Sequence, residues 1–200
     1  VIVPVYDSDW NKGVTLTEST ISWLTYDYEL DNHHSLKDGS FDGQTVVARE
    51  FKTYIIENEY LKLTLVPDFG GRILSMIYKP TGHEELYQNP VGAPYLMGAQ
   101  IFYHDWLMIW GGIFPTFPEP EHGKTWNLPW DFEVITDNGE VVEVEMSFID
   151  DIDNPNAPWN YPTGKTGIIC RFQVRLEDGS AAFSTHVELE NPAISPRAYE

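Results

Sequence analysis

Hydrophobic and polar residues alternate along most of this chain, and short groups of turn-forming residues interrupt the alternation at regular intervals. A period of two residues is typical of β-strands with one buried face. Lys52–Pro67 (KTYIIENEYLKLTLVP) predicts a hairpin that turns at Glu-Asn-Glu, and Gly71–Gln88 predicts a strand, a Pro-Thr-Gly turn and a short return strand. Asp131–Phe148 and Gly167–Asn191 predict two further hairpins, because an Asp-Gly or Asn-Gly turn divides each of them. Val1–Asp31 also has mainly strand character.

The sequence shows no amphipathic helix longer than two turns, no internal repeat and no low-complexity linker. Many short strands with regular turns predict an all-β fold, an antiparallel β-sandwich, and 200 residues fit a single domain. The composition of Asn89–Gln100 and Asp150–Thr166 predicts loops. The last segment, VELENPAISPRAYE, ends in a mixture of polar residues and two prolines. We therefore expect the sandwich to be incomplete at the C-terminus, as the N-terminal part of a larger domain or protein.

The negative net charge of the chain limits the partners that it can bind. Thirty-one acidic residues and 12 basic ones give a formal net charge of −19. Nucleic acid and anionic membrane surfaces would be repelled, so we expect neither as a partner. No apolar run has the length of a membrane-spanning helix.

The single cysteine, Cys170, excludes an internal disulfide and a thiolate zinc cluster. It lies in the apolar run GIICRF, where we expect a small buried residue and no catalytic thiol. The chain begins VIVPVY without methionine, which indicates a removed leader or a trimmed sequence. This leaves the compartment open, with a secreted or periplasmic location favoured over the cytoplasm.

Ile109–Trp130 (IWGGIFPTFPEPEHGKTWNLPW) has an unusual composition, with three tryptophans, two phenylalanines and four prolines. Proline is excluded from helix interiors and central strands, so the segment predicts a long irregular loop. Aromatic rings stack on the apolar face of a sugar, while carboxylates, an imidazole and an ammonium group bind its hydroxyls. The last tryptophan leads into a strand, so we expect it in the core. The candidate substrate-binding residues of the segment are Trp110, Glu119, Glu121, His122, Lys124 and Trp126.

Two candidates lie outside that segment. His104 precedes Asp105, and such a pair could orient an imidazole, but adjacent residues of a strand point to opposite faces, so a core strand is the favoured interpretation. Arg72 follows Gly70 and Gly71, which indicate a bulge or tight bend. Arg72 could bind a ligand carboxylate or phosphate, although arginines in such places more often lie at a surface or interface.

Cofactor and metal motifs are weak. The cluster DDIDNPN (residues 150–156) offers oxygen ligands for calcium but lacks the spacing of a calcium-binding loop, so a solvated acidic turn is favoured. The adjacent His33 and His34 lack a third zinc ligand in register. Glycine loops that hold phosphates and serine nucleophile motifs are absent from the sequence. We therefore expect no cofactor and no metal.

Two motifs resemble the galactose-mutarotase-like superfamily, the antiparallel "supersandwich" of aldose 1-epimerases and many carbohydrate-binding or carbohydrate-cleaving domains. Tyr54–Tyr87, with its central FGGRI, is similar to the opening strands of that family. Gly111–Val134, with Gly-Gly, Phe-Pro, His-Gly and a following tryptophan, is similar to the pattern of hexose-6-phosphate mutarotases. The FGGRI motif most resembles mutarotase-like proteins of the DUF5107 type.

The resemblance implies that His122 is a catalytic, substrate-contacting histidine near the ring oxygen of the sugar. Sugar-phosphate mutarotases carry an arginine before Gly-Gly and another after His-Gly, where this chain has Trp110 and KTWN, so an unphosphorylated sugar is expected. The family takes its second histidine and glutamate base from later strands, and His186 is not the obvious counterpart of that histidine. We therefore expect the 200 residues alone to accelerate mutarotation little, unless another chain or a C-terminal part completes the site.

Three functions follow as hypotheses. The first is aldose 1-epimerase-type isomerisation of an unphosphorylated mono- or oligosaccharide by acid–base catalysis. The second is a non-catalytic carbohydrate-binding or accessory domain of a polysaccharide-degrading protein. The third is a purely structural sandwich within a multidomain protein.

Overall fold

The computed structural model describes residues 13–29, 37, 40, 43–93, 109–118, 125, 128–151 and 165–196. The secondary structure in these ranges is β-strand, which confirms the predicted all-β class. The strands are β1 (Thr15–Tyr26), β2 (Val46–Glu57), β3 (Leu61–Val66), β4 (Arg72–Tyr78), β5 (His83–Glu84), β6 (Gln88–Ala93), β7 (Ile109–Gly111), β8 (Asp131–Asp137), β9 (Val141–Ile149), β10 (Ile169–Glu177) and β11 (Phe183–Glu190). Within the described ranges, no helix has the length and hydropathy needed to cross a bilayer.

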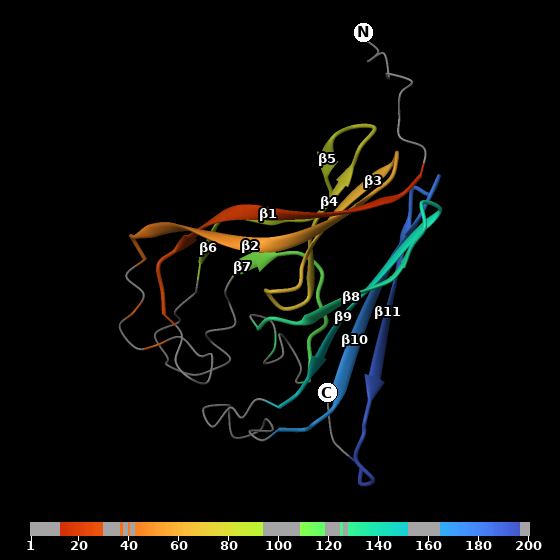
Figure 1. The fold of residues 1–200 in the computed structure, drawn as a ribbon. Coiled ribbons are helices and arrows are strands. Elements are labelled where there is room, and N and C mark those ends of the chain that lie inside the picture. Colours follow the sequence, from red (N-terminus) through yellow and green to blue (C-terminus); the bar gives the residue numbers. More distant parts are fainter. Residues whose placement is uncertain are drawn as a thin grey trace.

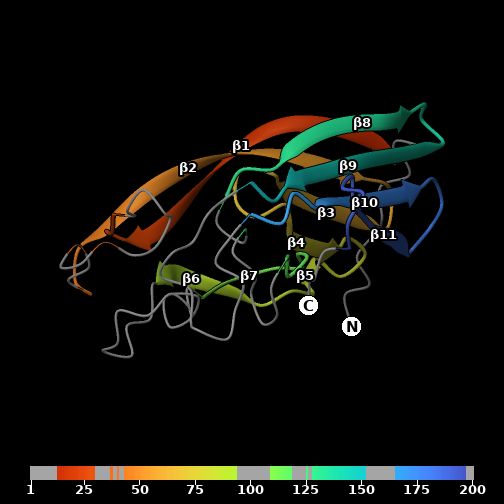
Figure 2. The same ribbon diagram turned by 90° about the horizontal axis from the view of Figure 1, so that it is seen from below.

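The strands form two sheets that pack face to face as a sandwich (Figures 1 and 2). The larger sheet has the order β5-β4-β3-β2-β1-β6-β7, and the smaller has the order β11-β10-β9-β8. The predicted hairpins correspond to β2–β3, β4–β5, β8–β9 and β10–β11, and all four pairs are antiparallel. Alternation and turn chemistry were therefore sufficient to predict these local pairings.

Two predictions about strand arrangement are wrong. Asn89–Gln100 was expected to be a loop, yet its first residues belong to β6. The sheet is not antiparallel throughout, because β6 runs parallel to β1 at the pair Thr25–Gly92. The residues of β6, QNPVGA, have loop composition, and it is tertiary contact that holds them. One such contact is the hydrogen bond from Trp23 Nε1 to the Asn89 carbonyl, at 3.1 Å.

The main core lies between the two sheets. Alternate residues of β2 and β3 face alternate residues of β9 and β10, and the ring of Tyr54 stacks on that of Phe132 with centroids 3.6 Å apart. Each large apolar side chain that becomes fully buried contributes about 1.5–3 kcal/mol. The fully buried members include Ile56, Leu63, Leu65, Val142, Val144, Met146, Val174 and Leu176.

The larger sheet also closes on itself. After β7, Ile113 exchanges two backbone hydrogen bonds with Ile73 of β4, each 2.9 Å long. The pairings β4-β3-β2-β1-β6-β7, followed by this bridge, form a complete circuit that we call the strand ring. In Figure 1, β6 and β7 lie beneath the long β1–β2 hairpin. A second apolar cluster, separate from the main core, belongs to the ring and contains Ile21, Trp23, Tyr28, Phe51, Val66, Phe69, Leu74 and Phe114.

Glycine is required where the ring closes. Gly111 and Gly112 both have positive φ, at +83° and +95°. A Cβ on Gly111 would lie 2.0 Å from the Tyr87 carbonyl oxygen, and one on Gly112 would lie 2.6 Å from the Ile73 carbonyl oxygen. No side chain fits at such distances, so the pair Gly-Gly permits the strand ring to close.

Candidate functional site

The two sequence motifs that carry the family resemblance contact each other directly. Gly70 and Gly71 adopt left-handed conformations in the turn between β3 and β4, which confirms the predicted bend. Gly70 N donates to the Leu128 carbonyl, at 2.8 Å, and Gly71 N and Trp130 N both donate to the Pro67 carbonyl, at 3.3 and 3.0 Å. A Cβ on Gly71 would lie 2.7 Å from the Trp130 ring, so the absence of a side chain makes room for the indole. The first motif thus fixes the end of the second.

Hydrogen bonds join Phe117, Thr125 and Trp130 within the second motif. Thr125 Oγ1 donates to the Phe117 carbonyl at 3.0 Å, and Trp130 Nε1 donates to the Thr125 carbonyl at 3.3 Å. All three residues are buried, and the rings of Phe117 and Trp130 meet edge to face. Trp130 is therefore a core residue, as expected. The hydrogen bond between Thr125 and Phe117 therefore holds these two residues next to each other. Residues 118–124, which include His122, connect them along the chain.

Arg72 joins the start of the second motif to the first. Its Nε donates to the Phe69 carbonyl at 2.7 Å, and its Nη1 donates to the Gly111 carbonyl at 2.8 Å. The guanidinium carbon lies 4.6 Å from the centroid of the Phe69 ring and 4.5 Å from that of Phe114. The expectation of a surface or interface arginine is wrong, because the residue is almost fully buried. A planar guanidinium can stack on two rings and donate in its own plane, which a lysine cannot do.

The charge of Arg72 survives this burial at neutral pH. Burial disfavours the charged form and lowers the pKa of the guanidinium to about 9, while the neighbouring Tyr28 opposes this shift. Two carbonyl oxygens and two ring faces take the place of the lost water. Arg72 is therefore a fixed cation inside the strand ring.

Sequence reasoning missed a second arginine in this region. The guanidinium carbon of Arg49 lies 4.4 Å from the centre of the Tyr28 ring, and Nη2 donates to the Tyr28 carbonyl at 2.8 Å. Arg49 Nε donates to Thr25 Oγ1 at 3.2 Å, and Asp27 lies at ion-pair distance, 3.6 Å. Burial raises the pKa of the Tyr28 phenol, and the two arginines, Arg49 and Arg72, partly offset this shift. The only signal in the sequence was that Arg49 shares a strand face with Phe51, two residues later.

The other predicted site residues are less fully described. Trp110 lies in β7 by its backbone, but its side chain is outside the described part of the structure. Among the candidate site residues predicted from the sequence, Arg72 is therefore the one whose side-chain contacts the structure describes. The roles of the other candidates remain predictions. The predicted residues that lie outside the described ranges are His104, Glu119, Glu121, His122, Lys124 and Trp126.

The predictions about metals and the cysteine have mixed outcomes. Asp150 is not a solvated residue, because it is buried and its Oδ2 accepts hydrogen bonds from the backbone and hydroxyl of Thr166. It thereby joins the two ends of segment 150–166, whose interior lies outside the described residues, as do His33 and His34. Among the described residues, no group of three metal-ligating side chains occurs. Cys170 is buried as expected, and burial raises the pKa of its thiol to about 12.

Comparisons with known proteins confirm the DUF5107 part of the family resemblance, and nothing in them supports the wider galactose-mutarotase-like superfamily. No curated protein matches the chain. The fold is similar to the crystal structure of a TPR-domain containing protein from Parabacteroides distasonis ATCC 8503, with a TM-score of 0.68 and 20% sequence identity. The match covers 90% of this chain and 30% of that one, so this chain spans less than a third of the length of that protein, and at this identity the likeness shows the fold alone. Residues 38–160 match the sequence model of the domain of unknown function DUF5107. Because this match covers more than half of the 200 residues, the chain belongs to the DUF5107 family.

Proposed function

We propose that this chain is a carbohydrate-active domain of the galactose-mutarotase-like type, and that it binds an unphosphorylated sugar at the segment between Phe117 and Thr125. The observation that supports this most is the interlocking of the turn Phe69–Arg72 with residues 111–130. A saccharide site needs aromatic faces and polar groups held in a fixed relation. The second motif supplies those residue types, and its two ends are anchored on buried residues.

Arg72 then acts as a positioning residue. Its hydrogen bond to the Gly111 carbonyl and its contact with the Phe114 ring fix the first residues of the segment that leads to His122. A ligand contact by the same guanidinium, as expected from the sequence, would require the sugar to reach a buried group. The net charge of −19 favours an uncharged ligand over a sugar phosphate.

The reaction that fits such a site is aldose 1-epimerisation, with His122 as one of two proton-transfer groups. A base removes the proton of the anomeric hydroxyl while an acid protonates the ring oxygen, and the bond between the anomeric carbon and the ring oxygen breaks. The resulting aldehyde rotates, and the reverse proton transfers close the ring as the other anomer. Histidine suits either role because its pKa lies close to neutral pH.

A second candidate is a saccharide-binding module without catalysis. It is favoured by the structural comparison, in which the same fold makes up 30% of a longer chain. A fold alone does not determine activity, so both candidates share the binding site and differ in the acid–base chemistry.

The test combines binding with polarimetry on D-glucose, D-galactose and glucose 6-phosphate. Calorimetric titration of the wild type should show binding of a free sugar, weakened in His122→Ala and Trp126→Ala. His83→Ala is the matched control, because that side chain is exposed and contacts Glu85. Acceleration of mutarotation that falls on the order of a hundred- to ten-thousand-fold in His122→Ala supports the isomerase. Because the 200 residues alone are expected to accelerate mutarotation little, polarimetry is repeated on a form of the protein extended at its C-terminus. Binding without acceleration in both forms supports the module, and the absence of saccharide binding, or a preference for the phosphate, contradicts the proposal.

A further inference from the structure

One fully buried hydroxyl inside the strand ring lacks a hydrogen-bond partner among the described residues. Thr53 of β2 is 0% exposed, and its Oγ1 has no partner in that part of the structure. A hydroxyl that is removed from water without a new hydrogen bond destabilises the folded state, so nearly all buried polar atoms have a partner. The Thr53 hydroxyl therefore points to a bound group beside it.

Thr53 faces the inside of the strand ring and not the main core. Its neighbour Tyr54 points to the main core, where its ring stacks on Phe132. Phe51, two positions earlier on β2, belongs to the apolar cluster of the ring. Side chains alternate along a strand, so Thr53 shares the face of Phe51. Because the side chain is fully buried, its partner has to be small enough to lie inside the ring.

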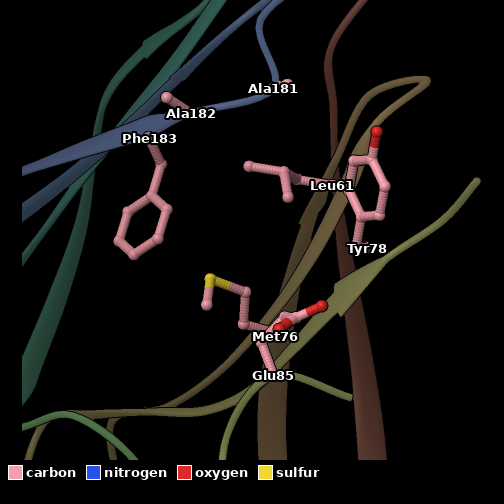
Figure 3. Close-up of a pocket in the computed structure, with 7 residues that line it drawn as sticks. All are labelled: Leu61, Met76, Tyr78, Glu85, Ala181, Ala182 and Phe183. Atoms are coloured by element: carbon pink, nitrogen blue, oxygen red, sulfur yellow. The ribbon is translucent and has the colours of Figure 1, made fainter. Parts of the chain in front are cut away.

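The pocket between the two sheets is a different space (Figure 3). It has a volume of about 350 Å³, and Leu61 and Met76 lie opposite Phe183 across it. Leu61 and Met76 belong to the main core or pack against it. The pocket therefore opens on the face of β3 and β4 that is opposite to the face of Thr53, and solvent in it does not reach the Thr53 hydroxyl.

Two further hydroxyls lie near Thr53 on the same face of the larger sheet. Ser19 of β1 is half-buried and is the direct partner of Thr53 in the antiparallel ladder. Thr64 of β3 is buried and pairs with Ile55, so it lies diagonally from Thr53. Directly opposite residues have Cβ atoms roughly 4.5–5.5 Å apart, and diagonal neighbours are roughly 7–8 Å apart. Three adjacent strands thus each place one hydroxyl on the same part of the inner face.

The chemistry of these groups suits water as the ligand. Each hydroxyl is neutral and can both donate and accept a hydrogen bond. A buried water typically makes about three hydrogen bonds to polar groups that have no other partner. A water with hydrogen bonds of about 2.8 Å holds two oxygens roughly 4.5 Å apart, which fits side chains at these spacings. A metal cation is disfavoured, because the fixed cation Arg72 lies opposite Val66 in the same ring.

We propose that the strand ring holds an internal water bound to Thr53 Oγ1, with the hydroxyls of Ser19 and Thr64 as its other partners. The water joins β1, β2 and β3 on the face that lines the ring. Val66, two positions after Thr64 on β3, packs in the apolar cluster with Phe69. The water therefore supports the wall of the ring against which the side chains around Arg72 pack.

The first test exchanges the hydroxyl of Thr53 for a methyl group. Valine has the shape of threonine, so Thr53→Val removes the hydroxyl and keeps the packing. If the hydroxyl had no partner, the variant should be at least as stable as the wild type. If the water is bound, the variant loses its hydrogen bonds, and the urea midpoint of unfolding should fall. Thr20→Val is the matched control, because Thr20 is exposed on the other face of β1 and the midpoint should stay unchanged.

A double-mutant cycle tests whether the hydroxyls share one water. Ser19→Ala should lower the urea midpoint in the wild type, and it should lower it less in Thr53→Val, where the shared water is already lost. Equal effects of Ser19→Ala in the two backgrounds would show that Ser19 does not bind the same water as Thr53, and would overturn that part of the proposal.

A crystal structure at a resolution that shows ordered water locates the ligand directly. We expect one water within about 3.2 Å of Thr53 Oγ1 and of a second hydroxyl in the wild type, and none there in Thr53→Val. Four results would overturn the proposal. These are no water at this place, a direct hydrogen bond between Thr53 and Ser19, a Thr53→Val variant as stable as the wild type, and a ligand at about 2.3–2.6 Å, which would be a metal cation.

Discussion

Replacing Gly111 by alanine tests how the strand ring closes. Gly111 has a φ of +83°, and an added Cβ would lie 2.0 Å from the Tyr87 carbonyl oxygen and 3.0 Å from its carbon. The obstacle is backbone rather than the end of a flexible side chain, so residue 111 itself must move. Its carbonyl accepts the hydrogen bond of Arg72 Nη1, and the bridge between Ile73 and Ile113 lies two residues further on.

The expected loss has two parts. A left-handed conformation costs a non-glycine residue roughly 1–2 kcal/mol. The displaced carbonyl loses a hydrogen bond to a charged donor, which contributes about 1.5–3 kcal/mol. We therefore expect Gly111→Ala to lower the free energy of unfolding by roughly 2.5–5 kcal/mol. Gly139→Ala is the matched control, because Gly139 has a φ of +85° and no atom within 4 Å of its added Cβ. It should lose only the first part, about 1–2 kcal/mol.

Urea denaturation followed by tryptophan fluorescence and circular dichroism measures both variants. If the reasoning is correct, the free energy of unfolding falls further in Gly111→Ala than in Gly139→Ala, by an amount typical of a hydrogen bond to a charged group. Equal losses in the two variants would refute it, because they would show that the ring can close around a side chain at position 111.

Three other predictions concern the interior. Arg72→Lys should lower the free energy of unfolding, measured in urea, by about 1.5–3 kcal/mol, since an ammonium group cannot stack on two rings and donate to two carbonyls. A variant as stable as the wild type would contradict this. Cys170 should resist iodoacetamide at pH 8 in the folded chain and react in concentrated urea, because the buried thiol has a pKa of about 12; labelling of the native chain, seen by mass spectrometry, would contradict its burial. Asp150→Ala should lower the melting temperature, since the backbone and hydroxyl of Thr166 lose their hydrogen-bond acceptor. Alanine at the exposed Asp151 is the control and should change the melting temperature little. Equal effects of the two substitutions would show that the buried carboxylate does not stabilise the fold.

The local part of the fold could be predicted from the sequence. Alternation and Asp-Gly or Asn-Gly turns correctly predicted the β8–β9 and β10–β11 hairpins, because both signals act between residues close in the chain. Strand β6 was missed, since its residues include proline and glycine and its partner, β1, is more than sixty positions away. Closure of the ring was missed for the same reason. Nothing in the sequence around the Gly-Gly pair at 111–112 identified the carbonyls of Tyr87 and Ile73 as its neighbours.

The candidate site was predictable in its residue types more than in its geometry. Gly70 and Gly71 indicated a bend, but nothing near them in the sequence showed that Trp130 fills the space above Gly71. Arg72 was recognised as notable, yet its burial depends on Phe69 and on Phe114, which is 42 residues later. A composition-based search cannot separate a ligand-binding arginine from one that holds backbone carbonyls, because both require the same side chain.

Mapping of the saccharide site by nuclear magnetic resonance tests the central claim most directly. Isotope-labelled protein would be titrated with D-glucose and D-galactose while the backbone amide signals are followed. The account predicts that perturbed signals cluster in residues 111–130 and in the turn at 69–72, which hydrogen bonds join to that segment. Perturbations that gather elsewhere, such as beside Phe183, or the absence of any perturbation at saturating sugar, would contradict it.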